Sequence, residues 1–180
     1  MDKQYYVLLI IGILIFVMLF FNKKVNLIRL FIKQFQVFKN DKTGKYSIWD
    51  IVSFFVIPIA ISVLFVFGMP YRVSSELAEV LTTVFSLVFS ILFGFAAVIM
   101  ERNASDNSKK RQVVNETFVS IVTATVLSLV ATIVSIFITQ IEDQGMISIL
   151  SVVIFALSLM IIMLILMITK RTFVIYCDGE

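Results

Sequence analysis

The stretch "SIVTATVLSLVATIVSIFIT", residues 120–139, decides the fold class, because it is uncharged and long enough to cross the hydrocarbon core of a bilayer as a helix. The same stretch carries seven hydroxyl side chains: Ser120, Thr123, Thr125, Ser128, Thr132, Ser135 and Thr139. Hydroxyls within a span either line a water-filled path or let neighbouring helices approach closely. The first arrangement indicates a pore or carrier, and the second indicates a packed scaffold.

The composition places the chain in a membrane and argues against an enzyme. Of 180 residues, 60% are hydrophobic, and the mean hydropathy is +1.04, which is more apolar surface than a soluble domain of this size can bury. The sequence has no histidine and a single cysteine, Cys177, so the commonest metal ligand and an intrachain disulfide are both missing. No phosphate-binding glycine loop or paired catalytic carboxylates appear either. We therefore predict no catalytic residue, metal site or cofactor.

Five segments are apolar and long enough to span a bilayer. They are Tyr5 to Phe21, Ile51 to Met69, Val80 to Met100, Phe118 to Ile141 and Met146 to Thr169. The first lacks a basic leader and a small-residue cleavage pattern, so it is predicted to be a retained anchor and not a removed signal peptide. We expect an all-α integral membrane protein whose residues 1–180 form one polytopic domain.

The positive charges predict the orientation, because cationic loops resist translocation. Lys and Arg number seven in residues 22–47, four in residues 101–117 and two in the C-terminal tail, a total of 13 on one side. The opposite side has two, Lys3 and Arg72. The N-terminus is therefore predicted outside and the C-terminus in the cytoplasm.

The stretch "KKVNLIRLFIKQFQVFK", residues 23–39, is too charged to span, but its apolar residues recur with helical periodicity. As a helix it places Arg29 and Lys33 opposite Phe31 and Phe35. Such a basic amphipathic helix either lies on the anionic inner leaflet or extends the first span and packs against a partner chain. The predicted lipid-binding or partner-binding residues are Lys23, Lys24, Arg29, Lys33, Lys39, Lys109, Lys110 and Arg111.

Small residues recur at intervals of four in two of the predicted spans. One stripe is Thr82, Ser86, Ser90 and Gly94, and the other is Ser120, Ala124, Ser128 and Thr132. Successive small residues bring membrane helices together, and their hydroxyls can bond the carbonyl four residues earlier without water. The stripes therefore predict either close packing of the third and fourth spans, including contacts in a homo-oligomer, or a hydroxyl-lined pore between subunits.

No Asp, Glu, Lys or Arg lies in the middle of any predicted span, which argues against proton-coupled transport and voltage sensing. Asp50 precedes the second span and is predicted to be a helix cap or interfacial ion pair, the competing interpretation being an ion site. Pro58 should bend that span, as an architectural kink or as part of a gate.

In its size, helical spans, basic stretch "KKVNLIRLFIKQFQVFK" and short tail "KRTFVIYCDGE", the chain resembles the small multi-pass membrane subunits of bacterial anti-phage defence systems, in particular the KwaA-like subunits of Kiwa systems. The resemblance implies a bacterial cytoplasmic membrane and a soluble cytoplasmic protein partner. Because cytoplasmic charge is the largest polar feature, we favour an oligomeric scaffold or sensor that recruits an effector, with no direct nucleic-acid binding. A pore-forming or membrane-disrupting effector is the alternative, and an uncoupled small-molecule carrier is a third.

Overall fold

The computed structural model describes residues 27–38, 47–101 and 108–177, and this part of the chain is helical with no strand. An amphipathic helix, α2 (Leu27–Val37), comes first. It is followed by a continuous helix composed of α3 (Ile48–Ile51), η1 (Val52–Val56), α4 (Ile57–Val63) and η2 (Leu64–Gly68). The three long helices α5 (Ser75–Glu101), α6 (Ser108–Thr139) and α7 (Gln144–Cys177) complete the fold.

Four of these helices are long and apolar enough to cross a membrane, which confirms the second to fifth predicted spans. They are Ile48–Gly68, Ser75–Met100, Arg111–Thr139 and Gln144–Phe173. The first predicted span, Tyr5 to Phe21, lies outside the described residues. The chain is therefore a multi-pass membrane protein by the length and composition of its helices.

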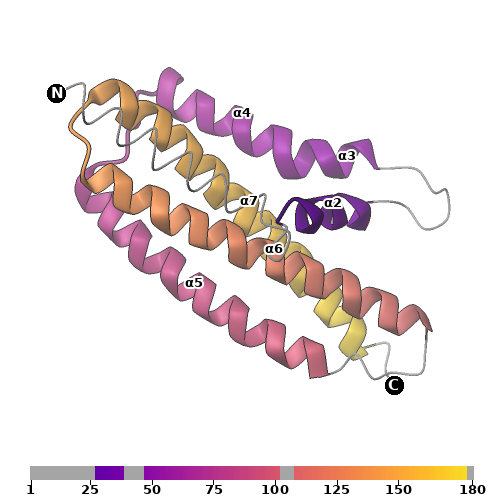
Figure 1. Ribbon diagram of the computed structural model, residues 1–180. Helices are drawn as coiled ribbons and strands as arrows, with labels where there is room; N and C mark the ends of the chain where they lie inside the picture. Colours follow the sequence, from indigo (N-terminus) through magenta and orange to yellow (C-terminus); the bar gives the residue numbers. More distant parts are fainter. Residues whose placement is uncertain (1–26, 39–46, 102–107, 178–180) are drawn as a thin grey trace.

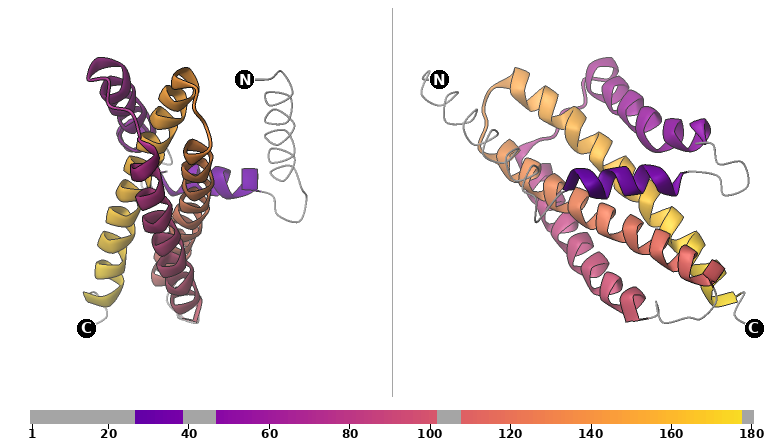
Figure 2. Two further views of the ribbon diagram at one scale, coloured as in Figure 1. Left: turned by 90° about the vertical axis from the view of Figure 1, so that its left-hand side faces the viewer. Right: turned by 45° about the vertical axis from the view of Figure 1, so that its right-hand side comes forward.

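The helix α6 lies at the centre of the bundle. It packs against α5 and α7 along their lengths, while α4 packs on α7 and α2 on α6 (Figures 1 and 2). Half of the apolar window of α6 is buried, compared with 17% for α5. A central helix in this arrangement must offer small side chains on several faces, because three neighbours approach it.

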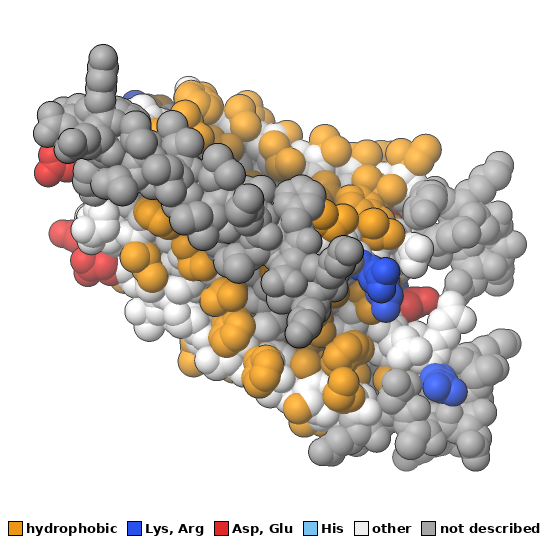
Figure 3. Space-filling view, in the orientation of Figure 1, with side chains coloured by type: hydrophobic (Ala, Val, Ile, Leu, Met, Phe, Trp, Pro, Cys, Tyr) orange, Lys and Arg blue, Asp and Glu red, His pale blue; other side chains and the backbone are white. Residues whose placement is uncertain are grey.

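The core follows a seven-residue spacing on each of the three long helices. The buried residues of α5 are Ala78, Phe85, Leu92 and Ile99, and Ala124 and Ala131 of α6 belong to the same cluster as the last three. A spacing of seven keeps one side of a helix against its neighbour over several turns. The outward surface is apolar as well, with hydrophobic side chains over all the visible helices (Figure 3), as expected of a surface solvated by lipid tails.

The helix around Pro58 adopts the local structure that a proline requires. The Ile57 amide bonds the Val52 carbonyl, five residues back, so the helix widens to a π-helical turn immediately before the residue that has no amide hydrogen. Pro58 is buried, and its carbonyl accepts a hydrogen bond from Ser62 Oγ at 2.7 Å.

The capping residue of α3 is Ser47, whose Oγ accepts a hydrogen bond from the Asp50 amide. Asp50 itself lies in the first turn, where a negative charge interacts favourably with the positive end of the helix dipole. Of the predicted alternatives for Asp50, the helix cap is therefore wrong.

Charges separate between the two ends of the bundle. We call the end where α6 passes into α7 the acidic end. Its charged side chains, among the residues that the structure describes, are Glu76, Glu79, Glu142, Asp143 and a single cation, Arg72. Arg111, Lys170 and Arg171 lie at the opposite, basic end, together with Asp50 and Glu116. Figure 3 shows most of the red surface at the acidic end and the larger blue patches toward the basic end.

Candidate functional site

The small-residue stripe of α6 lies inside the bundle. Ser120, Ala124 and Ser128 are fully buried, and Thr132 is partly buried. Ala124 belongs to the main core cluster, which includes Leu92 of α5 and Leu164 of α7. These small side chains let α6 lie close to its neighbours in the same chain.

All seven hydroxyls of residues 120–139 bond carbonyls of their own helix. Ser120 Oγ donates to Glu116, Ser135 Oγ donates to Ala131, and the other five make equivalent bonds, at 2.8–2.9 Å throughout. The donors need no water, because each hydrogen bond closes within one turn. Five of them are also buried, namely Ser120, Thr123, Thr125, Ser128 and Ser135, so within one chain these five hydroxyls lie in the helix packing and do not line a water path.

The stripe of α5 lies on the outer surface. Ser86, Ser90 and Gly94 are exposed, and a Cβ built on Gly94 would meet nothing within 4 Å. Helical residues follow one another at about 100°, which puts this stripe on the face opposite the core residues Phe85 and Leu92. The fourth predicted residue, Thr82, is partly buried at the edge of the stripe.

Two more small residues share that face, namely Thr83 and Ala97, both exposed. We call Thr83, Ser86, Ser90, Gly94 and Ala97 the outer stripe of α5. The sequence prediction used intervals of four and therefore did not include Thr83 and Ala97. These residues lie three positions from Ser86 and Gly94, a spacing that also returns to the same face of a helix. The two predicted stripes therefore do not face each other: one lies in the core, and the other on the surface.

The amphipathic helix α2 docks on the bundle of its own chain. The Phe35 and Phe55 rings stack with centroids 5.0 Å apart, and Phe38 lies 4.9 Å from the ring of Phe54. Phe38 is buried, whereas Ile32 on the other side of α2 is 53% exposed. This intramolecular contact was not among the two arrangements predicted from the sequence.

The predicted basic residues fall into three groups. Arg29, Lys33 and Arg111 are exposed. Lys109 and Lys110 lie in the first turn of α6, where the structure describes the backbone alone. Lys23, Lys24 and Lys39 lie outside the described residues.

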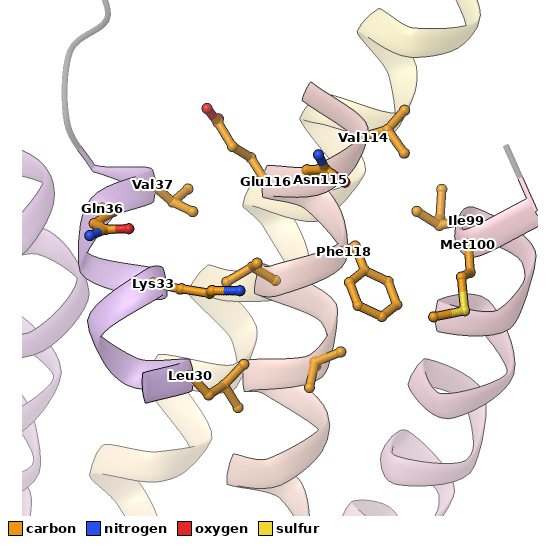
Figure 4. Close-up of a pocket in the computed structure, with 12 residues that line it drawn as sticks. Leu30, Lys33, Gln36, Val37, Ile99, Met100, Val114, Asn115, Glu116 and Phe118 are labelled. Carbon is orange, nitrogen blue, oxygen red and sulfur yellow. The ribbon is translucent and has the colours of Figure 1, made fainter. Parts of the chain in front are cut away.

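A groove of about 600 Å³ runs between α2, α6 and the C-terminal end of α5 (Figure 4). Most of its lining is apolar, from Leu30 on α2 to Phe118 and Val122 on α6 and Met100 on α5. Lys33 extends from α2 across the groove toward α6 (Figure 4). The groove thus combines a long apolar surface with a single lysine.

An ion pair connects α6 to α7 beside this groove. Arg171 Nη1 of α7 lies 3.1 Å from Glu116 Oε2 of α6, and Gln112 Nε2 donates to Glu116 Oε1 at 3.0 Å. Both oxygens of the Glu116 carboxylate therefore have a partner. The pair is partly exposed, so it contributes on the order of 1 kcal/mol or less to stability.

Gln34 of α2 is a polar side chain buried in largely apolar surroundings. It is 1% exposed, and neither Oε1 nor Nε2 has a hydrogen-bond partner in the described part of the chain. Around it lie Phe31, Phe54, Thr123 and Leu164, which belong to four different helical elements. An amide buried without partners costs about 1–3 kcal/mol, so it weakens the docking of α2.

Within the described ranges, no group of three or more His, Cys, Asp or Glu side chains could hold a metal ion. No family model, no curated protein and no solved structure matches the chain.

Proposed function

We propose that the chain is a non-enzymatic scaffold or sensor of a bacterial cytoplasmic membrane, which forms a homo-oligomer and recruits a soluble cytoplasmic effector. The observation that carries the proposal is the outer stripe of α5, which turns small residues away from the chain's own core. The placement in anti-phage defence rests on the resemblance alone.

The outer stripe has the properties of a contact between membrane helices. Lipid gives helices no hydrophobic reason to associate, so close backbone approach over small residues supplies the attraction. Ser86 and Ser90 already donate to the carbonyls of Thr82 and Ser86 at 2.8 and 2.9 Å, so a neighbouring helix need not satisfy their hydroxyls. The exposed Leu87 and Ile91 stand beside the stripe and provide a ridge that a second copy can pack against.

The basic end supports the recruitment of a soluble partner. Arg111 and Lys170 are exposed there, and the distribution of 13 cations against two predicts that this end faces the cytoplasm. Exposed cations at a membrane surface attract an acidic protein face and raise its rate of encounter. The proposal therefore places assembly on α5 and recruitment at the basic end.

A pore between subunits is the second candidate, and the exposure of Ser86 and Ser90 favours it. In an oligomer built around α5, these hydroxyls face either a neighbouring helix or a central path. The buried hydroxyls of α6 do not contribute to such a path. The scaffold and the pore thus both use the outer stripe of α5. In the scaffold the stripe contacts a helix of another subunit, and in the pore it contacts water.

The test combines Ser90→Leu with Gly94→Leu, which add bulk to the outer stripe without reducing hydrophobicity. Ala60→Leu is the matched control, because Ala60 is exposed on α4, away from α5. Cross-linking in native membranes should give fewer oligomers for the double variant and an unchanged ladder for the control. Co-purification should recover a stoichiometric soluble protein with the wild type, and less of it with Arg111→Glu.

Each outcome separates the candidates. An unchanged ladder in the double variant removes the outer stripe from the subunit interface and defeats the proposed assembly. Ion conductance from the purified wild type, lost in the double variant while oligomers persist, replaces the scaffold with the pore. Absence of any soluble partner together with intact oligomers removes the recruiting role.

A further inference from the structure

The groove between α2, α6 and α5 has two parts of different chemistry. Phe118 and Val122 of α6, Leu30 of α2 and Met100 of α5 form an apolar channel (Figure 4). Lys33 is the only Lys or Arg among its lining residues. Phe118 begins the predicted fourth span, and Val122 lies four residues further, about 6 Å along the helix, so the channel runs from the end of the span toward the hydrocarbon layer.

The charge of Lys33 is not neutralised within the described part of the chain. No hydrogen bond or ion pair of Lys33 occurs there. The nearest acid of the lining, Glu116, already pairs with Arg171 and Gln112. A lysine beside apolar surface at this depth is expected to meet an anion or to extend toward the headgroups.

We propose that this groove binds one anionic phospholipid of the membrane, with an acyl chain along Phe118 and Val122 and the headgroup phosphate against Lys33. An apolar channel with one cation matches a molecule that is apolar along most of its length and anionic at one end. Basic pockets between membrane helices bind acidic headgroups on the same principle. The site depends neither on the outer stripe nor on a soluble partner, so it is independent of the proposed scaffold.

The bound lipid would also connect α2 to α5. The groove takes its walls from both helices, whereas the main protein contacts of α2 are with α6 and with the helix that contains Phe54 and Phe55. Filling the groove adds contacts for the weakly held helix α2. Lipid composition is therefore expected to alter how firmly α2 is docked.

The experiment reconstitutes the full chain in nanodiscs of equal parts phosphatidylglycerol and phosphatidylcholine with identical acyl chains, and counts retained lipids by native mass spectrometry. The wild type should retain phosphatidylglycerol in preference. Lys33→Gln should reduce that preference about fivefold, the change expected for roughly 1 kcal/mol per cation near an anionic lipid. Arg72→Gln removes the same charge from an exposed residue at the acidic end, outside the groove, and should leave the preference unchanged.

A second variant tests the apolar part. Val122→Trp fills the channel and should lower retention of both lipids, with helicity by circular dichroism equal to the wild type as the check on folding. The proposal is overturned if Lys33→Gln keeps the wild-type preference, or if Arg72→Gln lowers it equally, because either result indicates surface charge without a site. Unchanged retention in a folded Val122→Trp chain would place any bound lipid outside the groove.

Discussion

Two helices of this bundle carry nearly the same pattern of small residues and use it in opposite ways. In α6 the stripe through Ser120, Ala124 and Ser128 is buried among neighbouring helices, whereas in α5 the stripe through Ser90 and Gly94 lies on the surface. Every hydroxyl in both stripes bonds its own helix. The pattern therefore marks a helix face that can be approached closely, and its position in the bundle determines which helix can approach it.

The largest effect is expected from adding the same bulk to one alanine in each helix. Ala124→Leu enlarges a side chain that is 0% exposed in the core and should lower the free energy of unfolding by about 1–3 kcal/mol through overpacking. Ala97→Leu makes the same change on the outer stripe and should change monomer stability by less than about 0.5 kcal/mol. Equilibrium unfolding of both variants in detergent, at concentrations where the chain is monomeric, gives the comparison. Equal destabilisation would show that the two stripes do not differ in burial.

The second effect is a stabilisation, and it concerns α2, the helix that docks on α6. Gln34→Leu removes an amide buried without partners and should strengthen the docking of α2, at the upper limit by about 1–3 kcal/mol. Hydrogen exchange of the α2 amides should slow accordingly. Gln36→Leu, at an exposed position of the same helix, is the control and should leave exchange nearly unchanged. Faster exchange in Gln34→Leu would mean that the amide makes a favourable hydrogen bond in solution.

Hydropathy alone located the four spans that lie in the described residues, with ends that differ from those of the structure by up to seven residues. It could not assign the buried face of each span, because the lipid-facing side of α5, with Leu87 and Ile91, is as apolar as the core side with Phe85 and Leu92. In water the polar face of a helix identifies its exterior, and in lipid this signal is lost. The docking of α2 on its own bundle could not be predicted from hydropathy either, because the residue that α2 buries most deeply is a glutamine, Gln34.

The smallest effect tests the hydroxyls themselves. Ser128→Ala in the core and Ser90→Ala on the outer stripe each delete a donor whose bond closes within its own helix, to Thr125 and Ser86 respectively. The acceptor carbonyls remain available to the helix's own amide ladder, so neither substitution leaves a buried group unpaired, and both should change monomer stability by less than about 0.5 kcal/mol. Oligomer assembly by cross-linking should also be retained in Ser90→Ala, because alanine keeps the surface small. A loss of assembly in Ser90→Ala, with stability unchanged, would show that this hydroxyl bonds across the subunit contact. The two stripes would then differ in their hydrogen bonding as well as in their position in the bundle.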